Sequence, residues 1–154
     1  MALIQEKSNK IKGLEVLLYV NVPDAQGTPI KTVVAGQRGA SLSMTADDID
    51  VTDKTTEGYK AFLAGLKEWN ISCDGLVCID DTGYKALVDA FLAGEVIEVD
   101  LRNGDYSFGY RGLVAISSMD FDAQYDDALT YACELKGASA LYKIDPNDPD
   151  NTSL

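Results

Sequence analysis

Residues 96–116, Val-Ile-Glu-Val-Asp-Leu-Arg-Asn-Gly-Asp-Tyr-Ser-Phe-Gly-Tyr-Arg-Gly-Leu-Val-Ala-Ile, carry the strongest local signal for the fold. Two alternating runs, Val96–Arg102 and Asp105–Ile116, flank Asn103-Gly104, the dipeptide typical of a type I′ hairpin turn. A two-residue turn sets the strand register. We therefore expect five cross-strand pairs: Arg102 with Asp105, Leu101 with Tyr106, Asp100 with Ser107, Val99 with Phe108, and Ile97 with Tyr110.

This register separates the side chains of the hairpin into two faces. One face carries only apolar or aromatic residues, namely Ile97, Val99, Leu101, Tyr106, Phe108 and Tyr110. The other face carries charges, namely Glu98, Asp100, Arg102, Asp105 and Arg111. The apolar face is expected to join a core, whereas the charged face is either an ordinary solvated surface or a surface with a function.

Alternating or short apolar runs predict further strands on both sides of this hairpin: Leu14–Val22, Ile30–Ala35, Ser41–Thr45, Trp69–Cys73, Leu76–Ile79 and Leu129–Gly137. One helix is expected, because a single apolar stripe is formed by Tyr84, Leu87, Val88, Phe91 and Leu92. Candidate caps precede it at Asp80, Asp81 and Thr82, and Gly94 is expected to end it. The sum predicts a mainly β fold, a β-sandwich or barrel of about eight strands with one flanking α-helix.

The segment between the early strands and Trp69 gives no regular pattern. Ala46–Gly58 holds five carboxylates, but it lacks the spacing of a calcium-binding loop and is interpreted as a solvated loop. Tyr59–Leu66 has a weak helical stripe between Gly58 and Gly65, and we interpret it as irregular or partly helical.

Composition excludes several kinds of chemistry. The 154 residues include 13 Lys+Arg, 25 Asp+Glu and no histidine, a formal net charge of −12. Without histidine there is no Ser-His-Asp or Cys-His catalysis and no His-ligated zinc. Because tight binding to nucleic acid requires a surplus of basic residues, the charge disfavours it. No apolar run reaches the ~18 residues of a membrane span, and residues 1–10 lack a signal-peptide core, so we expect a soluble chain made in the cytoplasm.

The three cysteines, Cys73, Cys78 and Cys133, form no disulfide framework because their number is odd. All three lie among apolar residues, so they are interpreted as buried free thiols rather than nucleophiles. Two other classes remain as alternatives. A small-molecule-binding β-barrel would need convergent polar groups, and a glycosidase-like enzyme would need a distinct carboxylate pair; neither stands out. No catalytic residue, cofactor or metal site is predicted, and no enzymatic activity.

The charge is distributed unevenly along the chain. Residues 1–38 carry a net charge of +2, whereas residues 39–154 carry −14. Much of the early positive charge comes from Lys7, Lys10 and Lys12, which are either part of an ordinary solvated terminus or of an arm that contacts the acidic face of a neighbouring copy. We expect an N-terminal arm at 1–13, a β-domain at 14–141 and a flexible C-terminal tail at 142–154.

Several short motifs, in this order, resemble a known family. They are Val34–Met44, Ile49–Lys54, Gly65–Gly75, the helix up to Gly94, Tyr110–Ile116 and Thr130–Gly137. Over roughly residues 14–140 the chain resembles the major tail tube protein of long-tailed bacteriophages, of the lactococcal-siphophage type. No single motif is diagnostic, but their order and spacing are specific.

The resemblance implies a structural virion protein rather than an enzyme. Six copies would form a ring, and rings would stack into a tube with a β-lined channel through which DNA passes without specific binding. Expected partners are further copies of the chain, a tape-measure protein, a tail terminator and distal tail proteins, with assembly in the bacterial host cytoplasm. An acidic body would repel DNA phosphates, so Glu98 and Asp100 are candidates for the lumen. Lys7, Lys10 and Lys12 are candidates for contacts with the acidic surface of a neighbouring subunit. Ala46–Leu66 is the candidate for contacts between rings, because it is long and mostly polar within a compact domain.

Overall fold

A computed structural model describes residues 11–23 and 26–145 of the chain. Eight strands, one α-helix and two 3-10 turns make up the described part. In chain order they are η1 (Gly13–Glu15), β1 (Leu17–Pro23), β2 (Pro29–Val33), β3 (Gln37–Asp50), η2 (Lys54–Thr56), β4 (Phe62–Leu76), α1 (Thr82–Ala93), β5 (Val96–Arg102), β6 (Gly109–Asp122), β7 (Thr130–Gly137) and β8 (Tyr142–Lys143). The mainly β fold with one helix is confirmed.

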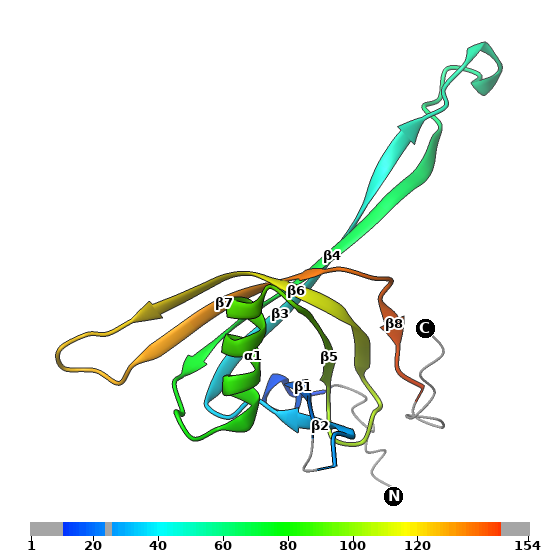
Figure 1. Cartoon of the computed structure of the whole chain (residues 1–154). Coiled ribbons are helices and arrows are strands. Elements are labelled where there is room, and N and C mark those ends of the chain that lie inside the picture. The colour runs from blue at the N-terminus through cyan, green and yellow to red at the C-terminus, as the bar shows by residue number, and fades with distance from the viewer. Residues whose placement is uncertain (1–10, 24–25, 146–154) are drawn as a thin grey trace, which may run out of the picture.

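All strands belong to one antiparallel sheet with the order β2-β1-β5-β6-β7-β4-β3, and β8 pairs with β6. The first half of β6 pairs with β5 and its second half pairs with β7, so this strand joins the two halves of the sheet. The sheet curls around α1, as Figure 1 shows. The side chain of Gln37, at the start of β3, bonds to the backbone N–H and C=O of Leu18 in β1, which brings the two far parts of the sheet together.

The core lies between α1 and the concave face of the sheet. The period-two alternation of the strands places every second side chain there, and α1 contributes Leu87. The buried strand residues are Leu18, Val20, Trp69, Ile71, Cys73, Val99, Leu101, Val114, Tyr131, Cys133 and Leu135. Tyr84 of α1 packs against Tyr131 and Phe121, with ring centroids 5.8 and 6.4 Å away. The helix therefore covers the face of β7 that carries Tyr131.

The predicted ends of the helix are confirmed. The Asp81 carboxylate accepts a hydrogen bond from the N–H of Tyr84, and Gly94 adopts a left-handed conformation, with its N–H bonded to the last turn. The apolar stripe is buried only in part. Leu87 and Ala90 face the core, while Phe91 and Leu92 near the C-terminal end remain exposed.

The predicted hairpin exists, but its predicted register is wrong. Arg102 pairs with Gly109 and Asp100 with Arg111, a shift of four residues on the second strand. Asn103 does not occupy a two-residue turn. Its side chain bonds to Ser107 and to the N–H of Phe108, and its own N–H bonds to the carbonyl of Phe108. Because the shift is even, the side chains of the two paired strands stay on their expected faces. Tyr106, in the six-residue loop that results, was expected on the apolar face but contacts Arg102 of the charged face.

The interpretation of Ala46–Leu66 as a loop is wrong for both of its ends. Ala46–Asp50 continues β3, and β4 already begins at Phe62. The predicted Ser41–Thr45 and Trp69–Cys73 strands are thus the middles of strands of 14 and 15 residues. Only residues 51–61 form the connection. Beyond the body, the two strands pair only with each other and project as a long hairpin (Figure 1).

The start of the expected C-terminal tail belongs to the folded body. Tyr142 and Lys143 pair with Arg111 and Tyr110, and Ile144 is buried against Gly109. A flexible tail from residue 142 is therefore wrong for residues 142–145, and residues 146–154 lie outside the described part. The described helix is too short to span a membrane.

Candidate functional site

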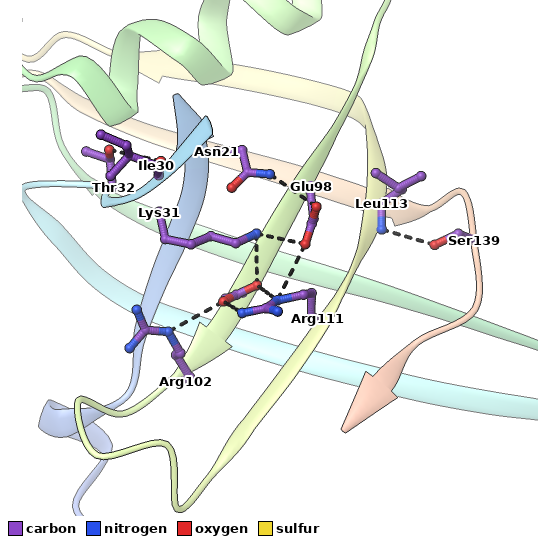
Figure 2. A network of polar contacts seen from close by, with 10 residues as sticks. Asn21, Ile30, Lys31, Thr32, Glu98, Arg102, Arg111, Leu113 and Ser139 are labelled. Carbon is purple, nitrogen blue, oxygen red and sulfur yellow. Dashed lines mark hydrogen bonds and ion pairs between the residues drawn. The ribbon is translucent and has the colours of Figure 1, made fainter. Parts of the chain in front are cut away.

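A cluster of five charged side chains from β2, β5 and β6, together with Asn21 from β1, joins these four strands (Figure 2). At its centre is Asp100, whose side chain is 0% exposed. Its carboxylate accepts two hydrogen bonds from Arg111, from Nε at 2.8 Å and from Nη2 at 2.9 Å. Lys31 Nζ lies 3.1 Å from one carboxylate oxygen, and Arg102 Nε lies 3.5 Å from the other. This arrangement compensates a buried negative charge with three cations.

Glu98 lies at the edge of the same cluster. Its carboxylate contacts Lys31 Nζ at 3.0 Å and Arg111 Nε at 3.4 Å, and it accepts a hydrogen bond from the Asn21 side chain at 3.1 Å. Bonding to Asp100, together with the charge of Glu98, raises the pKa of Arg111 above its ordinary value. Four strands that are distant in sequence are thereby fastened by charge-assisted bonds.

Arg102 is held by aromatic rings on both sides. Its guanidinium carbon lies 3.9 Å from the ring centre of Tyr19 and 4.2 Å from that of Tyr106. Both distances suit cation–π contacts. The charged face of the hairpin is therefore neither an open solvated surface nor an open functional surface, because β1, β2 and the loop after β5 contribute side chains that cover it.

This burial contradicts the expectation that Asp100 faces a channel. A carboxylate with no exposed surface, paired with cations of its own chain, does not present charge to a passing molecule. The periodicity placed Asp100 on the side away from the apolar core correctly, but it gave no sign that β1 and β2 would cover that side. Glu98 is partly exposed, and its lumen-facing role stays a prediction.

An open polar groove lies on the opposite side of the sheet from α1, across β3, β4, β7 and β6. Paired residues in neighbouring rows supply its exposed side chains, namely Ser41, Ser72, Asp74, Ser118, Asp120 and Glu134. Small residues, Gly39 and Ala132, make its floor flat, and none of the lining residues is basic. The groove thus presents negative charge and hydroxyl groups. The alternation in β7 was the sequence signal for this face, since Ala132 and Glu134 point away from Tyr131 and Cys133.

The projecting hairpin is the second open surface, and we call it the ribbon (Thr45–Asp50 paired with Phe62–Glu68). Large apolar side chains are exposed on both of its faces. Phe62 lies on one face, and Ile49, Leu63 and Leu66 lie on the other, because an irregularity in the register after Ala64 shifts the alternation of β4; Leu66 is 83% exposed. Among the residues that the structure describes, no layer covers either face, so packing within this part of the chain does not explain these side chains.

The tip of the ribbon is ordered by local hydrogen bonds. The Asp53 carboxylate accepts bonds from the N–H and hydroxyl of Thr55, and these bonds hold the pKa of Asp53 below its ordinary value of 3.8. Thr52 forms a hydrogen bond with Ala61 across the connection. Apolar residues at both odd and even positions of 62–66 were the sequence signal for the ribbon. Such a pattern does not distinguish a strand that is apolar on both faces from an irregular loop.

The predicted basic contacts are described only in part. Lys12 is exposed just before η1, while Lys7 and Lys10 lie outside the described residues. Within residues 11–23 and 26–145, no group of three or more Cys, Asp or Glu side chains is arranged to hold a metal ion.

Solved structures with the same fold come from tubular assemblies. The tail of an empty gene transfer agent particle matches with a TM-score of 0.76 at 24% identity, over 88% of this chain and 100% of that one. The virion of a native gene transfer agent matches with 0.72 at 25% identity, over 86% and 97%. The SPP1 tail tube matches with 0.70 at 16% identity, over 92% and 84%.

No curated protein matches the chain. The family model described as phage tail tube protein, however, matches residues 10–143, which include every described strand. With the fold, the two open surfaces and this match together, the chain belongs to the phage tail tube protein family, and its role is that of a structural component of a tail tube.

Proposed function

We propose that six copies of this chain form a ring, and that rings stack into the tail tube of a long-tailed phage of the lactococcal-siphophage type, a conduit for DNA. The ribbon carries this proposal, because its apolar side chains on both faces require covering by another molecule. Six-fold symmetry is supported by the similar gene transfer agent tail, which was solved with C6 symmetry. A second copy of the chain is the occupant that a repeating tube supplies.

The sheet edge supports the same arrangement. β3, of 14 residues, stands last in the strand order, and no strand of residues 11–23 or 26–145 pairs with its outer edge. An edge of this length is able to add a strand from a neighbouring copy and so continue the sheet around a ring. Ring closure would thus use the edge, and the ribbon, including the candidate Ala46–Leu66 segment, would contact the next ring.

Electron microscopy of the purified protein tests this assembly. We expect tubes from the natural chain and none from the double variant Phe62→Ser, Leu66→Ser. The matched control is Ile79→Ser, Leu92→Ser, which removes two apolar side chains of similar exposure from the body and is expected to leave tubes intact. Tubes of normal length from the ribbon variant would contradict the proposal. A persistent monomer of the natural chain that binds a small ligand would instead favour the alternative of a β-barrel binding module.

We further propose that the polar groove faces the channel. Asp74, Asp120 and Glu134 would present negative charge to DNA, and repulsion between like charges prevents the phosphates from binding to the wall. The groove lies opposite α1, so the helix would occupy the outside of the tube. Glu98, at the edge of its ion-pair cluster, would contribute only if the ring exposes it further.

Charge-reversal variants test whether the groove, rather than another part of the acidic surface, faces the channel. Particles carrying Asp74→Lys, Asp120→Lys and Glu134→Lys are expected to assemble but to release DNA more slowly. Asp89→Lys, Glu95→Lys, on and just after the exposed side of α1, is the control and should leave release unchanged. Equal release rates in both variants would remove the groove from the channel wall.

The N-terminal arm is proposed as a subunit contact through Lys7, Lys10 and Lys12. The imbalance between a net charge of +2 in residues 1–38 and −14 in the remainder supports an electrostatic contact with a neighbouring copy. Deletion of residues 2–12 is expected to block tube formation and to leave the thermal unfolding of the monomer unchanged. Normal tubes from this deletion would overturn the proposal.

The remaining partners follow from the proposed tube. A tape-measure protein, a tail terminator and distal tail proteins would define its length and ends, and assembly would take place in the host cytoplasm. No catalytic role is proposed for any residue. Co-purification of tagged tubes from infected cells, followed by mass spectrometry, tests these partners, and tubes that never contain them would contradict this part.

A further inference from the structure

Two cysteines from different strands face each other inside the sheet. Cys73 of β4 is paired directly with Cys133 of β7, and their sulfur atoms lie 2.7 Å apart. Both side chains belong to the core, with 4% and 3% of their surface exposed. The third cysteine, Cys78, follows β4 and is only partly buried.

The surroundings of the pair shield both thiols from reagents while the body stays closed. Neighbours in the same row of the sheet are Ala40 and Met119, which supply neither a base nor a cation. The hydrogen bond to Cys133, and burial after it, raise the pKa of the Cys73 thiol well above its ordinary value. The same hydrogen bond lowers the pKa of Cys133, which is therefore the better nucleophile of the two.

The geometry instead suits a covalent bond between the two sulfurs. Directly opposed residues of antiparallel strands have Cβ atoms about 4.5–5.5 Å apart, and a disulfide requires about 3.5–4.5 Å. The sulfurs need to approach by about 0.7 Å to reach a normal S–S bond of about 2.05 Å. This is a small adjustment in side chains that already point toward each other.

Access to the pair requires local opening of the sheet. The sulfurs point into the core on the α1 side, in one row with Ala40 and Met119, so the backbone of β4 and β7 separates them from the polar groove. A reagent therefore reaches the pair only when this part of the sheet opens transiently, and that opening sets the rate of the reaction.

We propose that Cys73 and Cys133 form an intrachain disulfide when the protein meets a small oxidising disulfide such as oxidised glutathione. One cysteine, as thiolate, attacks a sulfur of glutathione disulfide and displaces one glutathione thiolate, which takes up a proton. The second cysteine, after losing its proton, attacks the mixed disulfide and displaces the second glutathione. The protein loses two protons and two electrons, and one glutathione disulfide becomes two glutathione thiols.

The bond would lock the centre of the sheet. It joins strands whose cysteines are 60 residues apart, so it closes a long loop in the unfolded chain. Closing such a loop lowers the entropy of the unfolded state, and we expect the unfolding midpoint to rise by about 10 °C. This inference does not rest on the tube, because it concerns the isolated chain.

Thiol counting on the full-length protein tests the proposal. The folded protein is incubated with oxidised glutathione, quenched with acid, denatured and titrated with a thiol reagent. We expect three free thiols before treatment and one afterwards, with the thermal midpoint raised. Peptide mapping without reductant should join residues 68–85 to residues 112–136. Three thiols after treatment, or glutathione adducts without the crosslink, would overturn the proposal.

Two variants assign the bond. Because residues 68–85 contain both Cys73 and Cys78, the Cys78→Ala chain is mapped in parallel and should form the same crosslink, leaving no free thiol. Cys133→Ala should give no intrachain crosslink and no rise in the midpoint. Loss of the crosslink in Cys78→Ala would assign the reactive pair elsewhere and refute the inference. The thiol count uses the full-length protein without either substitution, so it still decides the question if Cys133→Ala fails to fold.

Discussion

The two halves of β4 differ in how far their side chains are buried. From Trp69 to Gly75 every second residue is buried, and this half pairs with β3 and β7. From Phe62 to Glu68 no residue is buried, although the half contains Phe62, Leu63 and Leu66, and it pairs only with β3. The same strand thus passes from a core that is covered within the body to a ribbon whose apolar side chains are exposed.

Truncation of one side chain in each half gives the largest expected contrast. Ile71→Ala removes a wholly buried side chain and is expected to lower the free energy of unfolding by about 3 kcal/mol. Leu66→Ala, five residues earlier on the strand, should change it by less than about 0.5 kcal/mol. Urea unfolding of the monomeric variants measures both. Equal losses at the two positions would show that the ribbon already packs within the monomer.

The ion cluster tests whether the body has a second anchor besides its apolar core. Arg111→Met leaves Asp100 buried without its two short bonds, and we expect a loss of about 2–3 kcal/mol. This loss of stability is smaller than that expected for a buried carboxylate without any cation, because Lys31 and Arg102 remain beside it. The exposed cation Lys85→Met on α1 is the control, measured by the same denaturant series. A change in the free energy of unfolding as small as that of the control would show that the cluster gives the fold no net stabilisation.

Trp69 marks the point where β4 leaves the body, and its packing offers a test of that boundary. The indole lies against Gly112 and Gly137, where a Cβ would overlap its ring atoms, and its Nε1 donates to the carbonyl of Ser139 at 2.8 Å. Gly137→Ala is expected to cost about 1–3 kcal/mol through overpacking. Gly104→Ala, in open space, is the control. Unchanged tryptophan fluorescence and stability in Gly137→Ala would contradict this close contact.

The smallest expected effect concerns the ribbon tip and pH. Because Thr55 bonds hold the pKa of Asp53 below 3.8, the stability this carboxylate gives the tip is present above its unfolded pKa and is lost as pH falls through its folded pKa. An NMR titration of the Asp53 carboxyl carbon should give a midpoint below 3.8. Thr55→Val, which removes the hydroxyl donor, should move the midpoint upward. A midpoint that does not move would exclude the hydroxyl as a cause.

Local sequence patterns predicted the elements whose structure depends on few long-range contacts. The α1 caps and the alternation of β7 follow from the sequence, since each depends on few contacts. The register of the β5–β6 hairpin did not follow, because Asn103 uses its side chain to close a six-residue loop in which Tyr106 takes a positive φ. Asn-Gly alone does not distinguish that loop from a two-residue turn.

The candidate site was harder to predict than the fold for a related reason. Whether a charge lies in solvent depends on what packs over it, and β1 and β2, about 70–80 residues away in sequence, cover Asp100. The ribbon presents the opposite case. Its carboxylates, such as Asp47 and Asp48, gave it the composition of a loop, yet it is a strand paired with β4. Polar side chains are tolerated there because the ribbon projects away from the core.

The cap of α1 has a consequence for the order of folding. The same oxygen of Asp81 that accepts from Tyr84 also accepts from the N–H of Ala35, which is 46 residues earlier. The helix start is thus stabilised fully only after the β2–β3 connection has docked, so local helix formation and long-range chain closure become one cooperative event. Amides at the beginning of α1 should therefore exchange with solvent as part of the same unit as the β2–β3 connection, and not as those of an independent helix.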